Sequence, residues 1–154
     1  MVISMKFERI KMLREEKEIK QIDLAKIFNI DNTTYSGWET GKDTIPLRKL
    51  NKLSNYYNTS IDYIVKLTNK KTYKIIEKEI NLNIVAQNLR QIRKEKNLLQ
   101  KDIFKLLNTT SSTYSAYETG KVLMQTTFIY IIAKEYGYSI DWILGKTKEK
   151  HYRK

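Results

Sequence analysis

The sequence has 154 residues, 41% of them apolar, with one proline and five glycines; this suits one ordinary domain or two small ones and favours packed helices over disorder or a turn-rich β fold. Its formal net charge of +12 favours a polyanionic partner, nucleic acid before an acidic membrane surface. The absence of cysteine excludes disulfides and Cys-based metal sites, and the single histidine, His151, is expected to be solvated rather than a ligand or base. We therefore expect no metal and no cofactor, and no separate domain for a small-molecule ligand is evident. No apolar run approaches the roughly 20 residues of a membrane helix, so we expect a cytoplasmic protein with no membrane partner.

The sequence repeats itself with a period of 79 residues. Residues 14–68 align with residues 93–147 without a gap, and 20 of the 55 aligned positions are identical. The run TYSGWETGK in the first copy corresponds to TYSAYETGK in the second. We therefore expect two copies of one domain with a linker and a basic tail, at residues 4–68, 69–83 (linker), 83–147 and 148–154 (tail). The linker is expected to be a short helix or an extended arm.

Each copy is predicted to contain five helices. The first is expected at about 5–17 and 84–96, following Ser4 and Asn83, which are good N-cap residues. The second is expected at about 21–28 and 100–107. Its apolar positions in the first copy are Leu24, Ile27 and Phe28.

A short turn separates the second helix from the third. Asn29 and Asn108 stand at this turn, and Asn tolerates a positive φ better than most residues. Asp31 in the first copy and Thr110 in the second can cap the third helix, which is expected at about 32–40 and 111–119 and ends before Gly41 and Gly120. Two short helices joined in this way form a helix-turn-helix.

The fourth and fifth helices complete each copy. The fourth is expected at about 46–57 and 125–136, with Pro46 in its first turn and with an apolar stripe at Leu47, Leu50, Leu53 and Tyr57. Ser60 and Ser139 are expected to cap a short fifth helix. Asp62 and Asp141 lie in its first turn, where the helix dipole favours negative charge.

The first copy contains the pattern R-x6-Q-x2-LA-x9-Y-x3-E-x-GK from Arg14 to Lys42, and much of the pattern recurs in the second copy. This pattern resembles the Xre/Cro family of lambda-repressor-like helix-turn-helix domains. The resemblance implies an all-α fold of two tandem five-helix domains that bind double-stranded DNA. It also implies a transcription regulator, a repressor that occupies its operator, acting as a homodimer or as a pseudo-dimer within one chain.

The resemblance also implies roles for particular residues, with the third helix placed in the major groove of DNA. The residues implied to contact bases are Asn32, Thr33, Ser36 and Gly37 in the first copy and Ser111, Ser112, Ser115 and Ala116 in the second. The residues implied to contact phosphates are Gln21 and Gln100 at the start of the second helix, Lys42 and Lys121 after the third, and Arg14 and Arg93 in the first. Arg14 and Arg93 are also implied to form ion pairs with Glu39 and Glu118, respectively.

The second copy departs from this pattern in two ways. Phe104 replaces Ala25 where the second and third helices cross, so the crossing must open or Phe104 must turn outward. The second copy also presents only small hydroxyl and methyl groups to the groove, so it reads bases or binds only phosphate or protein.

A second function remains open at this point. The alternative to a repressor is a protein-interaction or antitoxin-like module that binds a partner through the fourth and fifth helices, with Tyr63, Tyr138 and Trp142 as a contact patch. Core packing is the favoured interpretation for Trp142. An enzyme is not expected, because the sequence shows no nucleophile–base pair, no Gly-rich phosphate loop and no metal-ligand cluster.

Overall fold

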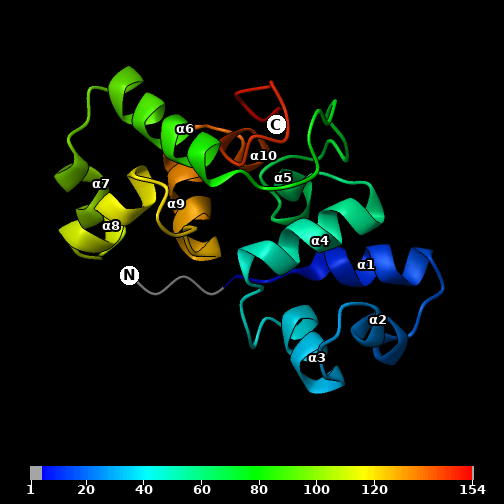
Figure 1. Ribbon diagram of the computed structural model, residues 1–154. Helices are drawn as coiled ribbons and strands as arrows, with labels where there is room; N and C mark the ends of the chain where they lie inside the picture. Colours follow the sequence, from blue (N-terminus) through cyan, green and yellow to red (C-terminus); the bar gives the residue numbers. More distant parts are fainter. Residues whose placement is uncertain (1–4, 154) are drawn as a thin grey trace.

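The computed structural model describes residues 5–153, and over that range it contains helices and loops but no strand (Figure 1). The helices of the first copy are α1 (Glu8–Glu16), α2 (Gln21–Ile27), α3 (Asn32–Thr40), α4 (Leu47–Tyr57) and α5 (Ile61–Ile64). Those of the second copy are α6 (Leu82–Glu95), α7 (Gln100–Leu106), α8 (Ser111–Glu118), α9 (Thr126–Tyr136) and α10 (Ile140–Ile143). The predicted all-α fold with five helices in each copy is confirmed. None of these helices is long and apolar enough to cross a membrane.

The first helix of each copy begins differently from the prediction. Ser4 lies outside the described residues, and α1 begins only at Glu8. The prediction of Asn83 as an N-cap was wrong, since Asn83 lies inside α6. Asn81 caps that helix instead: its backbone is extended and its Oδ1 accepts the N–H groups of Asn83 and Ile84.

The turns follow the local chemistry of the sequence. Asn29 and Asn108 have φ values of 53° and 54°, and Gly41 adopts the left-handed conformation after α3 with φ 80°.

Two details of the second and fourth helices differ from the prediction. Pro46 is the N-cap of α4 rather than part of its first turn. Ile27, one of the apolar positions of α2, is 55% exposed, because the helix turns its last residue away from the core.

Phe104 shows how the second copy accommodates a large residue at the helix crossing. Its equivalent, Ala25, is buried where α2 meets α3. Phe104 remains partly exposed and packs against the edge of the core. Phe104 is thus less buried than Ala25 at the equivalent position.

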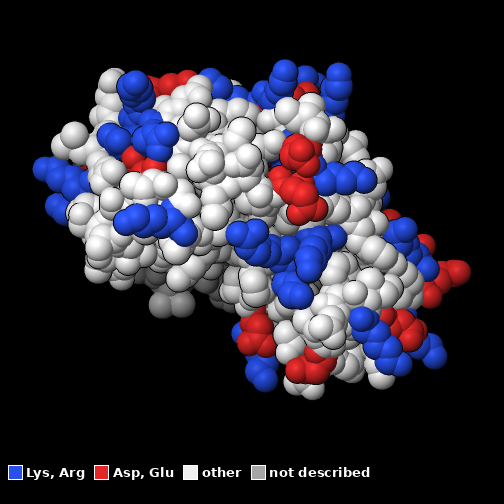
Figure 2. Space-filling view, in the orientation of Figure 1, with Lys and Arg blue, Asp and Glu red and all other residues white. Residues whose placement is uncertain are grey.

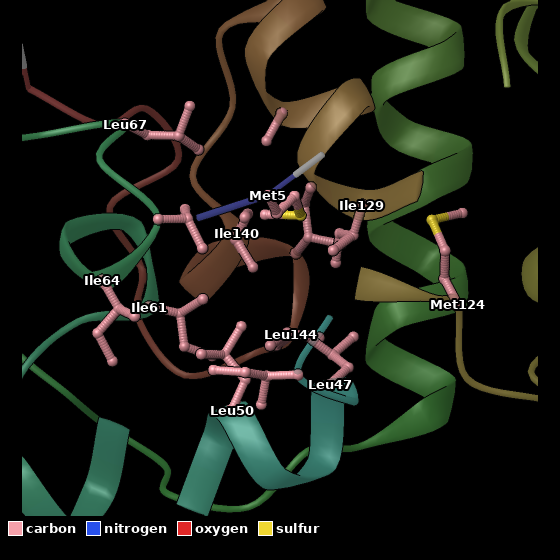
Figure 3. Close-up of a cluster of buried hydrophobic side chains, with 14 of the residues drawn as sticks. Met5, Leu47, Leu50, Ile61, Ile64, Leu67, Met124, Ile129, Ile140 and Leu144 are labelled. Carbon is pink, nitrogen blue, oxygen red and sulfur yellow. The ribbon is translucent and has the colours of Figure 1, made fainter. Parts of the chain in front are cut away.

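The two copies share one hydrophobic core (Figure 3). Leu47, Leu50 and Ile61 of the first copy lie in the same cluster as Ile140 and Leu144 of the second. Each fully buried side chain of this kind stabilises the fold by about 2 kcal/mol relative to its exposure in the unfolded chain. The relative placement of the copies is therefore part of the folded state.

At the centre of this junction, two buried aspartates cap each other's helices. The carboxylate of Asp141 accepts the backbone N–H groups of Ile61 and Asp62, both at 3.0 Å. The carboxylate of Asp62 accepts the N–H of Ile140 at 2.7 Å, along with the hydroxyl of Ser139. Each aspartate thus serves the fifth helix of the other copy, and not only its own helix dipole as the sequence predicts.

The symmetry of this contact defines how the copies are related. Residues 61 and 62 correspond to residues 140 and 141 in the alignment of the two copies. The bond from Ile61 N–H to Asp141 therefore becomes the bond from Ile140 N–H to Asp62 when the copies are exchanged. Contacts that are reciprocal in this way are characteristic of a twofold relation.

Of the two predicted forms of the linker, the short helix is absent: the backbone between residues 69 and 80 is irregular and is held by hydrogen bonds. The carbonyl of Lys71 accepts the N–H of Ser60, and the N–H of Ile76 donates to the carbonyl of Lys146. The basic tail packs like the start of the linker, since the carbonyl of Lys150 accepts the N–H of Ser139.

Candidate nucleic-acid interface

The N-terminal turns of α3 and α8 are fixed by caps on their own residues. The carboxylate of Asp31 accepts the N–H of Thr34 at 2.7 Å, and the hydroxyl of Thr110 accepts the N–H of Thr113 at 3.2 Å. Such a cap satisfies a backbone donor that has no partner within the helix. The two helices therefore begin at a defined residue and present a defined face.

The predicted base-contacting residues differ in exposure. Those that are exposed are Asn32, Thr33, Ser111 and Ser112, and those that are partly exposed are Ser36, Ser115 and Ala116. Gly37 is buried, so the expectation of an accessible Gly37 was wrong. The side chain of Asp43 covers it: a Cβ added to Gly37 would collide with Asp43 Oδ2.

The hydroxyl groups at the start of α8 are partly engaged with one another. Thr110 Oγ1 lies 2.9 Å from the hydroxyl of Thr113 and 3.3 Å from that of Ser112. Asn32, at the start of α3, forms no side-chain hydrogen bond within residues 5–153. Ser111, the equivalent of Asn32, likewise forms no side-chain hydrogen bond among the described residues, so the first copy offers a free amide at this position and the second a free hydroxyl.

An ion pair between a partly exposed arginine and a buried glutamate braces each of these helices against the first helix of its copy. Arg14 Nε lies 2.7 Å from Glu39 Oε2, and a second nitrogen of Arg14 lies 3.1 Å from Oε1. In the second copy Arg93 contacts Glu118 in the same fork, with distances from 3.0 to 3.2 Å. Both pairs implied by the family resemblance are present. The arginines face these carboxylates, and Arg14 also donates to the carbonyl of Ile19.

Burial raises the cost of ionising Glu39, but its hydrogen bonds outweigh that cost. The guanidinium of Arg14 and the amide of Gln21 hold the pKa of the Glu39 carboxyl below its usual range. Glu39 therefore remains an anion at neutral pH, and the bidentate pair keeps α3 in place.

The glutamines at the start of α2 and α7 are attached to the same carboxylates. Gln21 Nε2 donates to Glu39 at 3.1 Å, whereas the contact of Gln100 with Glu118 is longer, at 3.4 Å. Both side chains are partly exposed. Because an amide nitrogen carries two N–H groups, each glutamine keeps a donor for a further acceptor.

Cationic side chains lie near this face. Lys42 and Lys121, the predicted phosphate contacts after the third helices, are both exposed. Figure 2 shows Lys and Arg side chains gathered near the N-terminal half of α4. Arg48 is exposed at this end of α4, and the sequence analysis did not identify it as a candidate contact. Its place two residues after Pro46, at the predicted start of the helix, could have indicated it. Its equivalent is Thr127, so the second copy lacks this charge.

The aromatic residues that would form a protein-contact patch are not gathered on the surface. Tyr138 and Trp142 are buried and stack with their ring centroids 5.7 Å apart. Tyr63 is partly buried under the guanidinium of Arg9, 4.2 Å from its ring centroid. The expectation of a contact patch made of these three residues was wrong, because Tyr138 and Trp142 contribute to the core.

Comparison with known proteins gives a consistent picture. A family model described as "Helix-turn-helix" matches residues 10–64 and again residues 89–143. A relative in Bacillus subtilis (strain 168), named "Uncharacterized HTH-type transcriptional regulator YobD", is 32% identical over 73 residues. That match covers 47% of this chain and 65% of the relative, so the chain spans less than two thirds of the relative's length. No solved structure gives a significant match. Because the family model covers well over half of the sequence, in both copies, the chain belongs to the helix-turn-helix family, of the Xre and lambda-repressor type.

Proposed function

We propose that this chain is a sequence-specific, double-stranded-DNA-binding transcription regulator that acts as a repressor. Two capped and braced helices, α3 and α8, expose their N-terminal turns, and the core of the molecule fixes one helix relative to the other. Membership of the helix-turn-helix family and the similarity to a protein named as a transcriptional regulator support this proposal. Occupation of an operator that overlaps a promoter would exclude polymerase.

The observation that carries the proposal is the reciprocal contact between the copies. Asp62 and Asp141 cap each other's helices, which is the twofold relation found between the subunits of a dimer. DNA-binding dimers of this type place their recognition helices in successive major grooves, about 34 Å apart. One chain would therefore occupy two half-sites as a pseudo-dimer.

In this proposal the side chains divide into two groups. Asn32 and Thr33 contact bases in the first half-site and Ser111 and Ser112 those in the second, because these side chains are exposed on the first turns of α3 and α8. Gln21, Gln100, Lys42 and Lys121 contact phosphates, and Arg48 joins them at α4. Arg14 and Arg93 act through their carboxylate partners and position the helices.

Selection of bound sites from random duplex DNA at about 150 mM salt tests the proposal. We expect one enriched site with two half-sites about 10 base pairs apart, bound by one chain. Affinity for that site, measured by fluorescence anisotropy, should fall steeply between about 50 and 200 mM salt because several phosphates are contacted. Failure to enrich any sequence would overturn the proposal of a sequence-specific regulator.

A further inference from the structure

An acidic side chain stands on the face of α3 that is proposed to meet DNA. The carboxylate of Asp43 lies over Gly37, and its Oδ2 occupies the space that a Cβ of Gly37 would need. The N–H of Asp43 also donates to the carbonyl of Gly37 at 3.1 Å, which ties the loop to the helix. Because residues four apart share one face of a helix, this carboxylate lies one turn beyond Thr33.

The carboxylate is free to meet a ligand. Asp43 is exposed, and within residues 5–153 its side chain forms no hydrogen bond and no ion pair. An unpaired anion on a DNA-binding face is repelled by the phosphates. A hydrogen-bond donor on a base edge would offset this repulsion and give the side chain a role in sequence recognition.

The second copy has no such carboxylate. Ala116 takes the place of Gly37, so a methyl group occupies the position that Asp43 covers in the first copy. Ala116 is partly exposed, and Val122, which is aligned with Asp43, is 49% exposed. At matching points, one copy presents a hydrogen-bond acceptor and the other presents apolar groups.

We propose that the two copies read unlike half-sites: Asp43 accepts a hydrogen bond from the amino group of a cytosine, and Ala116 contacts the methyl group of a thymine. In the major groove cytosine presents an amino donor, whereas guanine presents two acceptors and thymine an acceptor beside its methyl group. Adenine places the N7 acceptor beside its amino group, which repels the second oxygen of a carboxylate. This inference rests on the proposed function and gives the operator a direction, with a distinct half-site for each copy.

The test compares the full chain with two matched variants, Asp43→Asn and Ala116→Gly. Each protein is used for site selection, and affinities are then measured by anisotropy for the wild-type site, for its single-base variants and for an unrelated duplex. We expect the wild type to select cytosine at one position of one half-site only. Asp43→Asn should lose about fivefold or more on that site. It should bind the unrelated duplex as tightly as the wild type or more tightly, because a repelled charge has been removed.

Ala116→Gly is the matched control. It should lose the thymine preference in the other half-site and leave the cytosine preference intact. If Asp43→Asn tightens binding to every duplex alike, the carboxylate only repels DNA and the inference fails. Two identical half-sites selected by the wild type would also overturn it, while leaving the proposed function in place. If the wild type selects no site, the proposed function itself fails.

Discussion

Glu39 and Asp62 are both buried carboxylates, and different partners keep them in the interior. Glu39 has a cationic partner, Arg14, and its pKa lies below the usual range. Asp62 has backbone and hydroxyl donors from Ile140, Ser139 and Tyr73. Burial, and then the neighbouring charge of Asp141, raises the pKa of Asp62 well above its ordinary value. The first residue holds a helix in its own copy, and the second holds the copies together.

Gln21 and Asn32 should respond differently to alanine substitution. Gln21→Ala removes a phosphate contact in the proposed complex, so we expect affinity to fall by a similar factor for all duplexes. Asn32→Ala removes a base contact, so it should lower the discrimination between the selected site and its single-base variants. Anisotropy titrations against a panel of duplexes measure both effects. Gln100→Ala is the control in the second copy, and equal losses of discrimination for Gln21→Ala and Asn32→Ala would contradict the assignment.

Asp62 and Asp141, each of which accepts at least one N–H group from the fifth helix of the other copy, form a clamp between the copies. Substitution of Asp62 tests this clamp. Asp62→Ala leaves the N–H of Ile140 and the hydroxyls of Ser139 and Tyr73 without their acceptor, and we expect the free energy of unfolding to fall by about 3 kcal/mol or more. Asp62→Asn keeps a carbonyl acceptor and removes the buried charge, so its loss should be smaller. Urea denaturation followed by circular dichroism measures both values. A change of less than about 1 kcal/mol in Asp62→Ala would be incompatible with the clamp.

The same carboxyl predicts a pH dependence. Its pKa is raised in the folded state, so below about pH 4 both states hold the proton, and as the pH rises the unfolded state releases it first. The contribution of Asp62 to stability is therefore present at low pH and is lost as the pH rises through the folded-state pKa. From pH 4 to pH 7, the wild type should lose stability relative to Asp62→Asn. The difference between their urea midpoints measures this, and a constant difference would contradict it.

At the scale of the helices, the sequence predicts what is decided locally. Caps and turns depend on residues within one or two turns, so Asp31, Asn29 and Gly41 could be assigned from the sequence. Contacts between distant residues follow no local pattern. The covering of Gly37 by Asp43 depends on the path of a loop, and the contact between Asp62 and Ile140 joins residues 78 apart in the chain. The helices α3 and α8 could therefore be predicted, whereas the carboxylate of Asp43 over Gly37 and the contact between Asp62 and Ile140 could not.

The crossing of the second and third helices gives a paired prediction. Ala25 is 2% exposed between α2 and α3, so Ala25→Phe must separate the helices, and we expect a loss of about 2 kcal/mol. Phe104 lies at the edge of the core, so Phe104→Ala should cost about 1 kcal/mol or less. Thermal and urea unfolding of the two variants provide the comparison. The reverse order of losses would show that α7 and α8 depend on Phe104 as a core residue.

At the scale of the whole molecule, one core and the reciprocal contacts of Asp62 and Asp141 hold two similar units in one fixed relative placement. Tandem copies on a flexible linker would bind half-sites at many spacings and in either orientation. Here the linker is bound along its length, and residues of both copies pack in one cluster. The alignment of the copies predicted two similar domains, but only long-range packing sets their mutual orientation. If the proposed function holds, the spacing between half-sites is set by the fold.

The response to spacing follows from that rigidity. Inserting five base pairs between the half-sites rotates one of them by about half a turn of DNA, to the opposite face of the duplex. Because the copies share a core, the second recognition helix cannot follow, and affinity should fall to that for a single half-site, a loss of about 100-fold or more. The same five base pairs placed outside the two half-sites serve as the control and should leave affinity unchanged. Equal binding to the original and lengthened sites, measured by anisotropy with the intact chain, would mean that the copies separate on DNA and that the clamp of Asp62 and Asp141 opens in the complex.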